Sequence, residues 1–465
     1  MKKWNDPLKN KIIAELRNSI FLTVPMVMTS MFGMLLATVD TYVAGTISVE
    51  ALTAVSVGNS IFWLVAVPLI AILNSMDVFF SRAFGANDKR NLDDCLVQSF
   101  WLSLCLIIIS IPLVVLVTLA YQLTNITDTA FAGVTEYVKG LLPSMVLILL
   151  CVPLEKYWNC QNRVFLWTTL SIVLLPVNYF FDVYISTEAF NGLGLGVYGI
   201  GLTTTLCNGI NLVAVAIYTA FVWKRNGGFL STFQPPNIHF LKKVLKIGLP
   251  ASGQEGTDVL GFSLLNYMAA FFGNAAVAAH QVVFIISTIF YMISSGWSDA
   301  ASIRIGYYLG AKQFRFAAKL GTLNMMFIGV VFVFFSVGVW LYKYSILSLF
   351  LDAPELVNMA ADLLSICVFM MTANAIQCLK GGTMRAWGDS SKAFYTNLFA
   401  FYAVGLPVAY YLAFYTNAGI RGIWIGLLVI MIVCAFLNIL LWFYVIKKYP
   451  FSRVESFSLV KSFEN

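Results

Sequence analysis

The chain has 465 residues, of which 60% are apolar and only 11% are charged. A soluble protein of this length needs far more charge on its surface, so the composition excludes a water-soluble enzyme and indicates a surface covered by lipid. The formal net charge of +7 does not indicate a nucleic-acid partner, because the basic residues lie between long apolar runs.

Twelve apolar runs of about 20 residues or more follow one another, and each is long enough to cross roughly 30 Å of hydrocarbon as a helix. The runs are continuous rather than alternating, so they do not predict the strands of a barrel. The expected fold class is an all-α polytopic membrane protein with twelve transmembrane helices in two pseudo-symmetric six-helix bundles. The predicted spans are 19–44, 52–80, 96–119, 132–154, 166–186, 197–223, 247–272, 276–302, 320–342, 357–380, 393–415 and 420–446.

The segment before the first run does not have the features of a cleavable signal. It is polar and basic from Met1 to Arg17, and the apolar run after it is too long for a signal-peptide core. Across the whole chain, only Lys139, Lys343 and Arg421 of the 29 Lys and Arg fall in or near segments predicted to lie outside. The positive-inside rule therefore predicts an inner-membrane protein with both termini in the cytoplasm.

The two halves of the sequence also share matching residues in the same order. A shift of 225 positions places Pro25 on Pro250 and the Gly-Ala pair at 85–86 on the pair at 310–311. Six spans in each half give both halves the same orientation, so an axis along the membrane normal relates them and substrate is expected at their interface.

This repeat predicts the domain organisation. The segment between the halves has Gly and Pro pairs and basic ends, which are typical of a linker. The expected parts are an N-lobe (1–223), a cytoplasmic linker (224–246), a C-lobe (247–446) and a cytoplasmic tail (447–465).

Five short motifs occur in order on these spans. They are "VDTYVAG" in the first span, "PVNYFFD" in the fifth, "GLP" at the start of the seventh, and "AAHQ" and "ASIRIGYYLGA" at the two ends of the eighth. Together they resemble the multidrug and toxic compound extrusion (MATE) family, in particular its bacterial NorM-like and DinF-like members, over residues 15–446. The resemblance implies an antiporter with two lobes around a central cavity, which exports bulky, amphipathic and often cationic compounds while sodium ions or protons move inward.

Four polar residues of the N-half fall at one level of the predicted membrane. At about 1.5 Å per helical residue, Asp40 and Asp182 lie roughly 8 Å below the outer surface, and Thr204 lies roughly 12 Å below it. Asn178 is one turn from Asp182 on the same helix face. Carboxylates in hydrocarbon are costly and commonly serve ion movement. These oxygens suit a hard monovalent cation, or protons, since burial and like-charge repulsion favour the protonated carboxyl.

The resemblance implies the same assignment, because the matching positions form the N-lobe cation or proton site of the family. We therefore expect Asp40 and Asp182 to be coupling carboxylates, with Asn178 and Thr204 as neutral ligands. The structural alternative is that the four side chains only lock helices together through hydrogen bonds.

The C-half departs from the family pattern. Asp258 matches a position where sodium-coupled NorM-type members carry Glu, but Asn374 stands where they carry a further acid and Met370 where they carry an aromatic residue. Two interpretations therefore stay open for the C-half. One is an ion site formed by Asp258, Glu255 and Asn374, and the other is that Asp258 and Glu255 attract cationic substrates. Asp299 is expected to pair with a base.

Three further polar residues favour structural interpretations. Lys380 and Arg385 flank the predicted inner end of the tenth span, and both can extend to the lipid phosphates. His280 within "AAHQ" is expected to pack between helices.

Several activities lack their motifs. The sequence contains no GxxxxGK[ST] loop for a nucleotide and no HExxH zinc site. We expect no enzyme activity, no cofactor beyond the coupling ion (H+ or Na+), and no metal beyond possible sodium at Asp40, Asn178, Asp182 and Thr204.

The preferred interpretation is a secondary antiporter, and the alternative is a lipid-linked oligosaccharide flippase of the same wider superfamily. Such flippases tend to have a cationic cavity, whereas the ionisable residues within these spans are mostly acidic. The expected partners are small organic, often cationic substrates and the lipid bilayer, but no nucleic acid, and the protein is expected to be a monomer.

Overall fold

The computed structural model describes residues 7–122, 128–188, 192–225 and 234–448, and this described part contains helices but no strand. It forms two compact units. Met28–Ser252 make up one, the N-unit, and the described residues up to Val27 together with those from Gly253 onward make up the other, the C-unit. Helices predominate because each satisfies its own backbone hydrogen bonds, as a chain in hydrocarbon requires.

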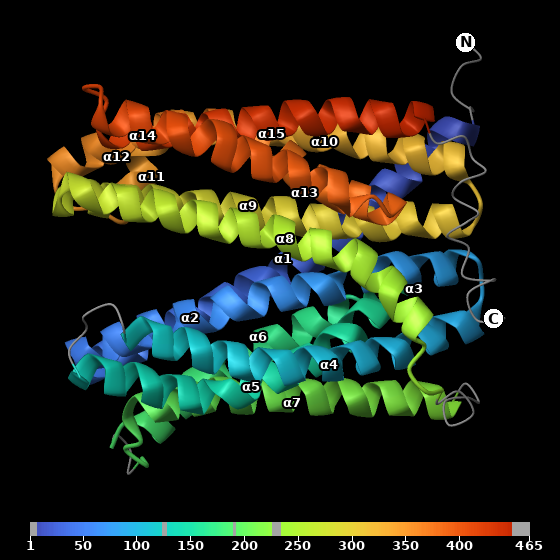
Figure 1. Ribbon diagram of the computed structural model, residues 1–465, viewed down its shortest axis with the longest axis horizontal. Coiled ribbons are helices and arrows are strands. Elements are labelled where there is room, and N and C mark those ends of the chain that lie inside the picture. Colours follow the sequence, from blue (N-terminus) through green and yellow to red (C-terminus); the bar gives the residue numbers. More distant parts are fainter. Residues whose placement is uncertain (1–6, 123–127, 189–191, 226–233, 449–465) are drawn as a thin grey trace. The chain divides into compact units, whose positions relative to one another are not determined.

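In Figure 1 the long helices within each unit run roughly side by side. Two helices pass from one unit to the other, namely α1 (Pro7–Ile47) and α8 (Ile238–Ala269). The other N-unit helices are α2 (Val49–Asn74), α3 (Met76–Gly85), α4 (Lys89–Gln122), α5 (Asp128–Cys160), α6 (Phe165–Ser186) and α7 (Gly196–Arg225). The other C-unit elements are η2 (Ala270–Phe272), α9 (Asn274–Gly310), α10 (Phe314–Leu341), α11 (Lys343–Leu347), α12 (Pro354–Trp387), α13 (Ser390–Leu398), η3 (Phe399–Gly405), α14 (Leu406–Phe414) and α15 (Ile420–Lys448).

The helices confirm the predicted all-α polytopic class. Eleven segments of the described chain are long and apolar enough to cross a membrane. The predicted span 247–272 is not among them, although it lies within the 32-residue α8 and the short η2 that follows it. The polar residues Gln254, Glu255 and Asp258 lower the hydropathy of this helix.

Two predicted spans are interrupted in the structure. The span 52–80 breaks at Ser75, between α2 and α3. The span 393–415 contains the π-helix η3, which ends just before Pro407. Because Pro407 has no N–H to give to the preceding turn, a local change of helix pitch is an expected response.

The internal repeat is visible in the turns. Asn87 and Lys312, which are 225 positions apart, follow α3 and α9 with φ values of 56° and 58°. In each turn the next residue donates its N–H to the carbonyl five residues earlier, at 3.0 Å for Asp88 and 2.8 Å for Gln313. The two halves thus share local geometry as well as sequence.

The boundaries between the two units also fall at matching positions of the internal repeat. The chain changes unit after Val27 and again after Ser252, in each case two residues after a matched proline, Pro25 or Pro250. This division differs from the predicted lobe limits, since the start of α1 belongs to the C-unit and residues 238–252 belong to the N-unit. Of the predicted linker, 226–233 lie outside the described residues, as do 1–6 and 449–465 at the ends of the chain.

A buried ion pair fixes the first part of α1 within the C-unit. Arg304 of α9 donates from Nε to Glu15 Oε2 at 2.9 Å, and only 7% and 6% of these two residues are exposed. Removing one partner of such a pair costs about 3–5 kcal/mol, because the other charge is left buried. The charges of α1 and α9 therefore hold these helices together.

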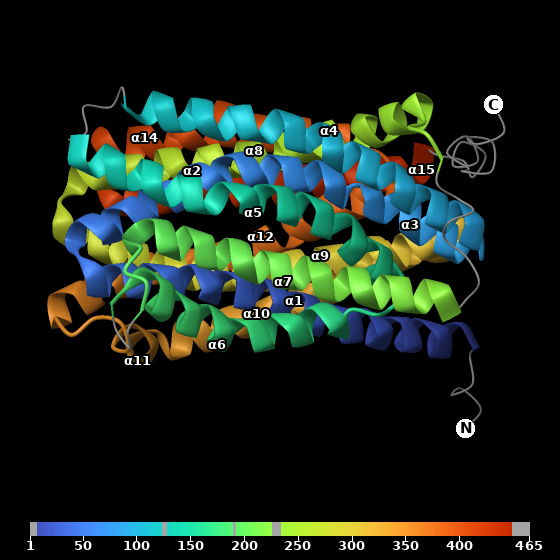
Figure 2. The same cartoon turned by 90° about the horizontal axis from the view of Figure 1, so that it is seen from below.

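Two glycines bring α5 and α7 into backbone contact, and Figure 2 shows these helices side by side. A Cβ on Gly140 would lie 2.4 Å from the carbonyl oxygen of Tyr198, and one on Gly201 would lie 2.5 Å from that of Tyr137. No larger residue fits without moving a helix. This close approach places Tyr137 and Thr204 in the same region of the N-unit.

Candidate functional site

The four predicted N-lobe residues meet inside the N-unit. Asp40 of α1 is 4% exposed and accepts a hydrogen bond at 2.7 Å from the Thr204 hydroxyl of α7. Its other oxygen is 3.4 Å from Asn178 Nδ2 of α6. Asp182, one turn beyond Asn178, is fully buried. We call these four residues the carboxylate site.

Three oxygens of the carboxylate site are buried without a hydrogen-bond donor in the described part of the chain. Asp182 lies beside Asp40 and Thr203, but neither of its carboxylate oxygens has hydrogen-bond geometry to a described residue. Asn178 Oδ1 is likewise unpaired. If the four residues only locked helices together, these oxygens would face donors, since a buried acceptor without one costs about 1–3 kcal/mol.

The donor set fits a proton or a hard monovalent cation. It consists of two carboxylates, an amide oxygen and a hydroxyl, which are the oxygen ligands that such a cation prefers. Among the described residues, no group of three or more His, Cys, Asp or Glu side chains is placed to hold a metal ion. The carboxylate site therefore differs in composition from a transition-metal centre.

Sequence reasoning missed three neighbours of this site. Tyr137 of α5 is 1% exposed and lies within electrostatic reach of Asp40 and Asp182. Thr203 and Cys207 of α7 also border the carboxyls. Nothing in the sequence distinguishes Tyr137 from the apolar residues around it. Thr203 could have been predicted, because it is next to Thr204 in the sequence.

The C-unit has a second buried polar network around Asp258 of α8. Asn397 of α13 donates from Nδ2 to Asp258 Oδ1 at 2.9 Å, and it accepts from Gln377 of α12 at 3.3 Å. Gln377 also lies next to Asp258. The carboxyl of Asp258 is therefore held by two amide side chains that the sequence did not single out.

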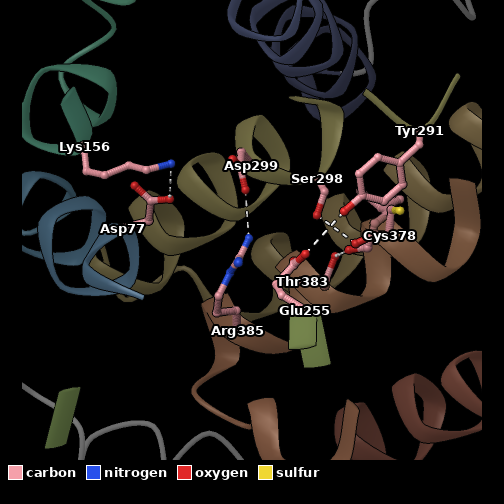
Figure 3. A network of polar contacts seen from close by, with 10 residues as sticks. Asp77, Lys156, Glu255, Tyr291, Ser298, Asp299, Cys378, Thr383 and Arg385 are labelled. Atoms are coloured by element: carbon pink, nitrogen blue, oxygen red, sulfur yellow. Dashed lines mark hydrogen bonds and ion pairs between the residues drawn. The ribbon is translucent and has the colours of Figure 1, made fainter. Parts of the chain in front are cut away.

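Glu255 makes a separate set of contacts, which Figure 3 shows together with a neighbouring ion pair. The Tyr291 hydroxyl of α9 is 3.3 Å from Glu255 Oε2, and Arg385 Nη2 pairs with Asp299 Oδ1 at 2.8 Å. Asn374 joins neither group, since its contacts are with Met431 Sδ and the Cys378 thiol.

The predicted C-lobe set is thus only partly assembled. Glu255 and Asp258 are close enough to interact electrostatically, and the expected pairing of Asp299 with a base is confirmed.

The prediction that Lys380 and Arg385 extend to the lipid phosphates is wrong. Arg385 is buried in its ion pair with Asp299, and Lys380 is fully buried with its ammonium 3.9 Å from the centre of the Trp442 ring. Both sit on α12, whose last turns pack inside the C-unit rather than against lipid.

The packing role of His280 is confirmed. Its Nδ1 lies 3.1 Å from the indole nitrogen of Trp424, and its Nε2 lies 2.7 Å from Asn266 Oδ1. An acceptor at Nδ1 and a donor at Nε2 describe a neutral imidazole whose two nitrogens are both satisfied.

Two helical units with an internal repeat and with buried carboxylates in each have the architecture of a membrane transporter. The sequence matches the family model described as MatE over residues 25–184 and 250–411, once in each half. The chain therefore belongs to the MatE family, as its five motifs predicted.

Similar proteins agree with this assignment. The chain is 28% identical over 433 residues to the "Probable multidrug resistance protein NorM" of Shewanella oneidensis, covering 88% of this chain and 90% of that one. It is 26% identical over 429 residues to the protein of the same description from Neisseria meningitidis serogroup B, covering 91% and 93%. The fold matches the crystal structure of the Vibrio cholerae MATE transporter VcmN in the bent form with a TM-score of 0.80 at 21% identity, covering 94% and 98%.

Proposed function

We propose that the protein is a secondary antiporter that exports amphipathic, often cationic compounds while protons or sodium ions move inward. The observation that carries this proposal is the carboxylate site, in which two neighbouring buried carboxyls and an amide leave three oxygens without a donor among the described residues. Relatives described as multidrug resistance proteins support the substrate class.

The physical basis of coupling lies in the charge of the carboxylate site. Two adjacent carboxylates repel each other when both are ionised, and each is stabilised by a bound proton or cation. The hydrogen bonds to Asp40 come from Asn178 and Thr204, so they join α1 to α6 and α7. A change of occupancy therefore changes how strongly these three helices attract one another.

For transport, ion and substrate must each bind the inward-open and outward-open conformations with different affinity. We propose that filling the carboxylate site favours the conformation that releases substrate outside. The oxygen ligands serve a proton and a sodium ion equally, so the proposal covers both.

The C-unit acids are proposed to attract the substrate. Glu255 is half-buried, Asp258 is buried, and the two are close enough to interact electrostatically, so a cation beside them would be favoured over an anion. The proposal includes a bacterial inner-membrane location with both termini in the cytoplasm, a monomeric state, and lipid and small organic molecules as partners.

The test is transport in proteoliposomes with an imposed pH gradient or an imposed sodium gradient. Export of ethidium driven by one gradient, and its loss in Asp182→Asn but not in Asp352→Asn, is the expected result. Asp352 is an exposed acid and serves as the matched control. The proposal fails if neither gradient drives export of any cationic dye by well-folded protein. Transport of lipid-linked sugars by that protein would support the flippase instead.

A further inference from the structure

A pocket of about 260 Å³ lies at the other end of the N-unit. It is formed where α3 ends and α4 begins, and where α5 and α7 end, and its walls include Phe84, Tyr157, Trp158 and Trp223. Trp223 is 19 residues from Thr204 along α7, or roughly 28 Å at 1.5 Å per residue, so the pocket is separate from the carboxylate site. The positive-inside rule predicts that this end faces the cytoplasm.

The polar atoms of the aromatic side chains are satisfied inside the unit. The indole N–H of Trp223 donates to the Tyr157 hydroxyl at 3.2 Å, which donates to Asp93 Oδ1 at 2.7 Å. The indole N–H of Trp158 donates to the Thr219 hydroxyl at 2.9 Å. The rings therefore present carbon and π surface to the pocket, which suits a flat apolar or aromatic group.

Carboxylates border this aromatic wall. Asp88 lines the pocket, and its Oδ1 accepts the backbone N–H three residues further on at 3.1 Å, which fixes it at the start of α4. Asp93 and Asp94 follow in the next turn, and Asp94 Oδ1 is buried without a hydrogen-bond partner in the described chain. Lys89 also lines the pocket, but its side chain is exposed, as is that of Arg90, so both can extend into water. The guanidinium of Arg163 lies 5.2 Å from the centre of the Trp158 ring. Asp88, held by its hydrogen bond at the start of α4, is therefore the fixed charge among the residues that line the pocket, and it favours a cation over a phosphate group.

We propose that this pocket is a recruitment site for flat aromatic cations on the cytoplasmic side. The proposal rests on the proposed export function and narrows the class of exported substrates. Aromatic faces and a carboxylate are the groups that recognise organic cations. The volume suits a single flat, fused ring system.

The test is ethidium binding to the purified full-length protein, followed by the dye's fluorescence, together with the kinetics of ethidium efflux. Trp223→Leu removes one aromatic face, and Asp88→Asn removes the charge while keeping a residue that begins a helix equally well. We expect each to weaken ethidium binding about 5- to 20-fold and to raise KM for efflux with little change in kcat. Trp340→Leu and Asp352→Asn, at exposed positions of the C-unit, are the matched controls and should leave binding unchanged.

Unchanged ethidium binding in both pocket variants would overturn the proposal. The proposal would also be overturned if the pocket variants lose binding to phosphatidylglycerol micelles while their ethidium binding is unchanged. That result would assign the pocket to a lipid phosphate. If Trp223→Leu does not fold, Trp223→Phe and Asp88→Asn decide. Pocket-dependent ethidium binding without any efflux would refute the export function alone, whereas efflux that is insensitive to both variants would refute the pocket alone.

Discussion

Asp40→Asn separates the charge of the carboxylate site from its hydrogen bonds. Asparagine has the same shape, and its Oδ1 can still accept from one of the two donors, Thr204 or Asn178. A hydrogen bond to an ionised group contributes about 1.5–3 kcal/mol and one between neutral groups about 0.5–1.5 kcal/mol, so roughly 1 kcal/mol is lost at each bond. Burying a neutral amide is less costly than burying a carboxylate, which offsets part of that loss.

The variant is therefore expected to fold with a thermal midpoint within a few degrees of wild type, because about 1 kcal/mol shifts the midpoint of even a smaller domain, of about 150–250 residues, by only ~2–4 °C. Gradient-driven transport should fall much more. Coupling free energies between two ligands are typically about 1–3 kcal/mol, which corresponds to about 5- to 150-fold. We expect at least about a 10-fold loss of gradient-driven ethidium export.

The assay compares gradient-driven export with ethidium binding in detergent, in wild type, Asp40→Asn and Asp352→Asn. Only Asp40→Asn should lose export. Its ethidium binding should remain within about 2-fold of wild type, because no substrate contact is removed. Full export by Asp40→Asn under either gradient would refute the coupling role of this carboxyl. A collapse in thermal stability with retained specific activity would instead show that Asp40 serves packing.

Three other substitutions test the contacts around the sites. Thr204→Val keeps the side-chain shape but removes the donor to Asp40, so gradient-driven transport should fall about 10-fold. Thr204→Ser keeps the donor and should restore transport. Equal rates in wild type and both variants would count against a ligand role for Thr204. Lys380→Met should leave thermal stability unchanged or raised, because it replaces a buried charge with an apolar chain. A double-mutant cycle with Trp442→Leu should give about 1–2 kcal/mol of coupling, and a value near zero would contradict the cation–π contact. Gly201→Ala should lower stability by about 1–3 kcal/mol in thermal unfolding, because its Cβ would lie 2.5 Å from the backbone of α5; an unchanged midpoint would mean that the helices separate freely.

The sequence predicted features that follow from helix geometry and from the solvent. Continuous apolar runs gave the helices, and the four-residue spacing of Asn178 and Asp182 was enough to place both on one face of α6. Asp40 and Thr204 were joined to them through predicted depth and through the family resemblance. Depth is common to helices from different parts of the chain, so it can bring together residues that are far apart in sequence.

Features that depend on packing between helices could not be predicted in this way. Lys380 and Arg385 lie near a helix end, where exposure to lipid phosphates and burial in the unit give the same sequence pattern. Only the positions of Trp442 and Asp299 distinguish the two cases. Tyr137 likewise becomes a neighbour of the carboxylate site because α5 and α7 meet at glycines, and this contact depends on the surfaces of both helices.

The repeat makes the chemical difference between the halves informative. At the positions 225 residues after Asp40 and Asp182, the C-half carries Leu265 and Pro407. Neither can bind a cation through its side chain, so the proposed coupling site exists in one half only. A symmetric pair of ion sites would load both halves alike, whereas a single site changes the charge of the N-unit alone.

The helices that carry the acids explain how such a local change can act on the whole protein. Asp40 belongs to α1 and Asp258 to α8, the two helices that pass between the units. Each of them has a proline just before its passage, where the missing N–H weakens the helix and permits a bend. In the proposed mechanism, an ion on Asp40 or a cation beside Asp258 would therefore act on a segment that is continuous with the other unit. Because the same two helices connect the units, a charge change at either acid has a covalent route to both halves, and no chain of side-chain contacts is required.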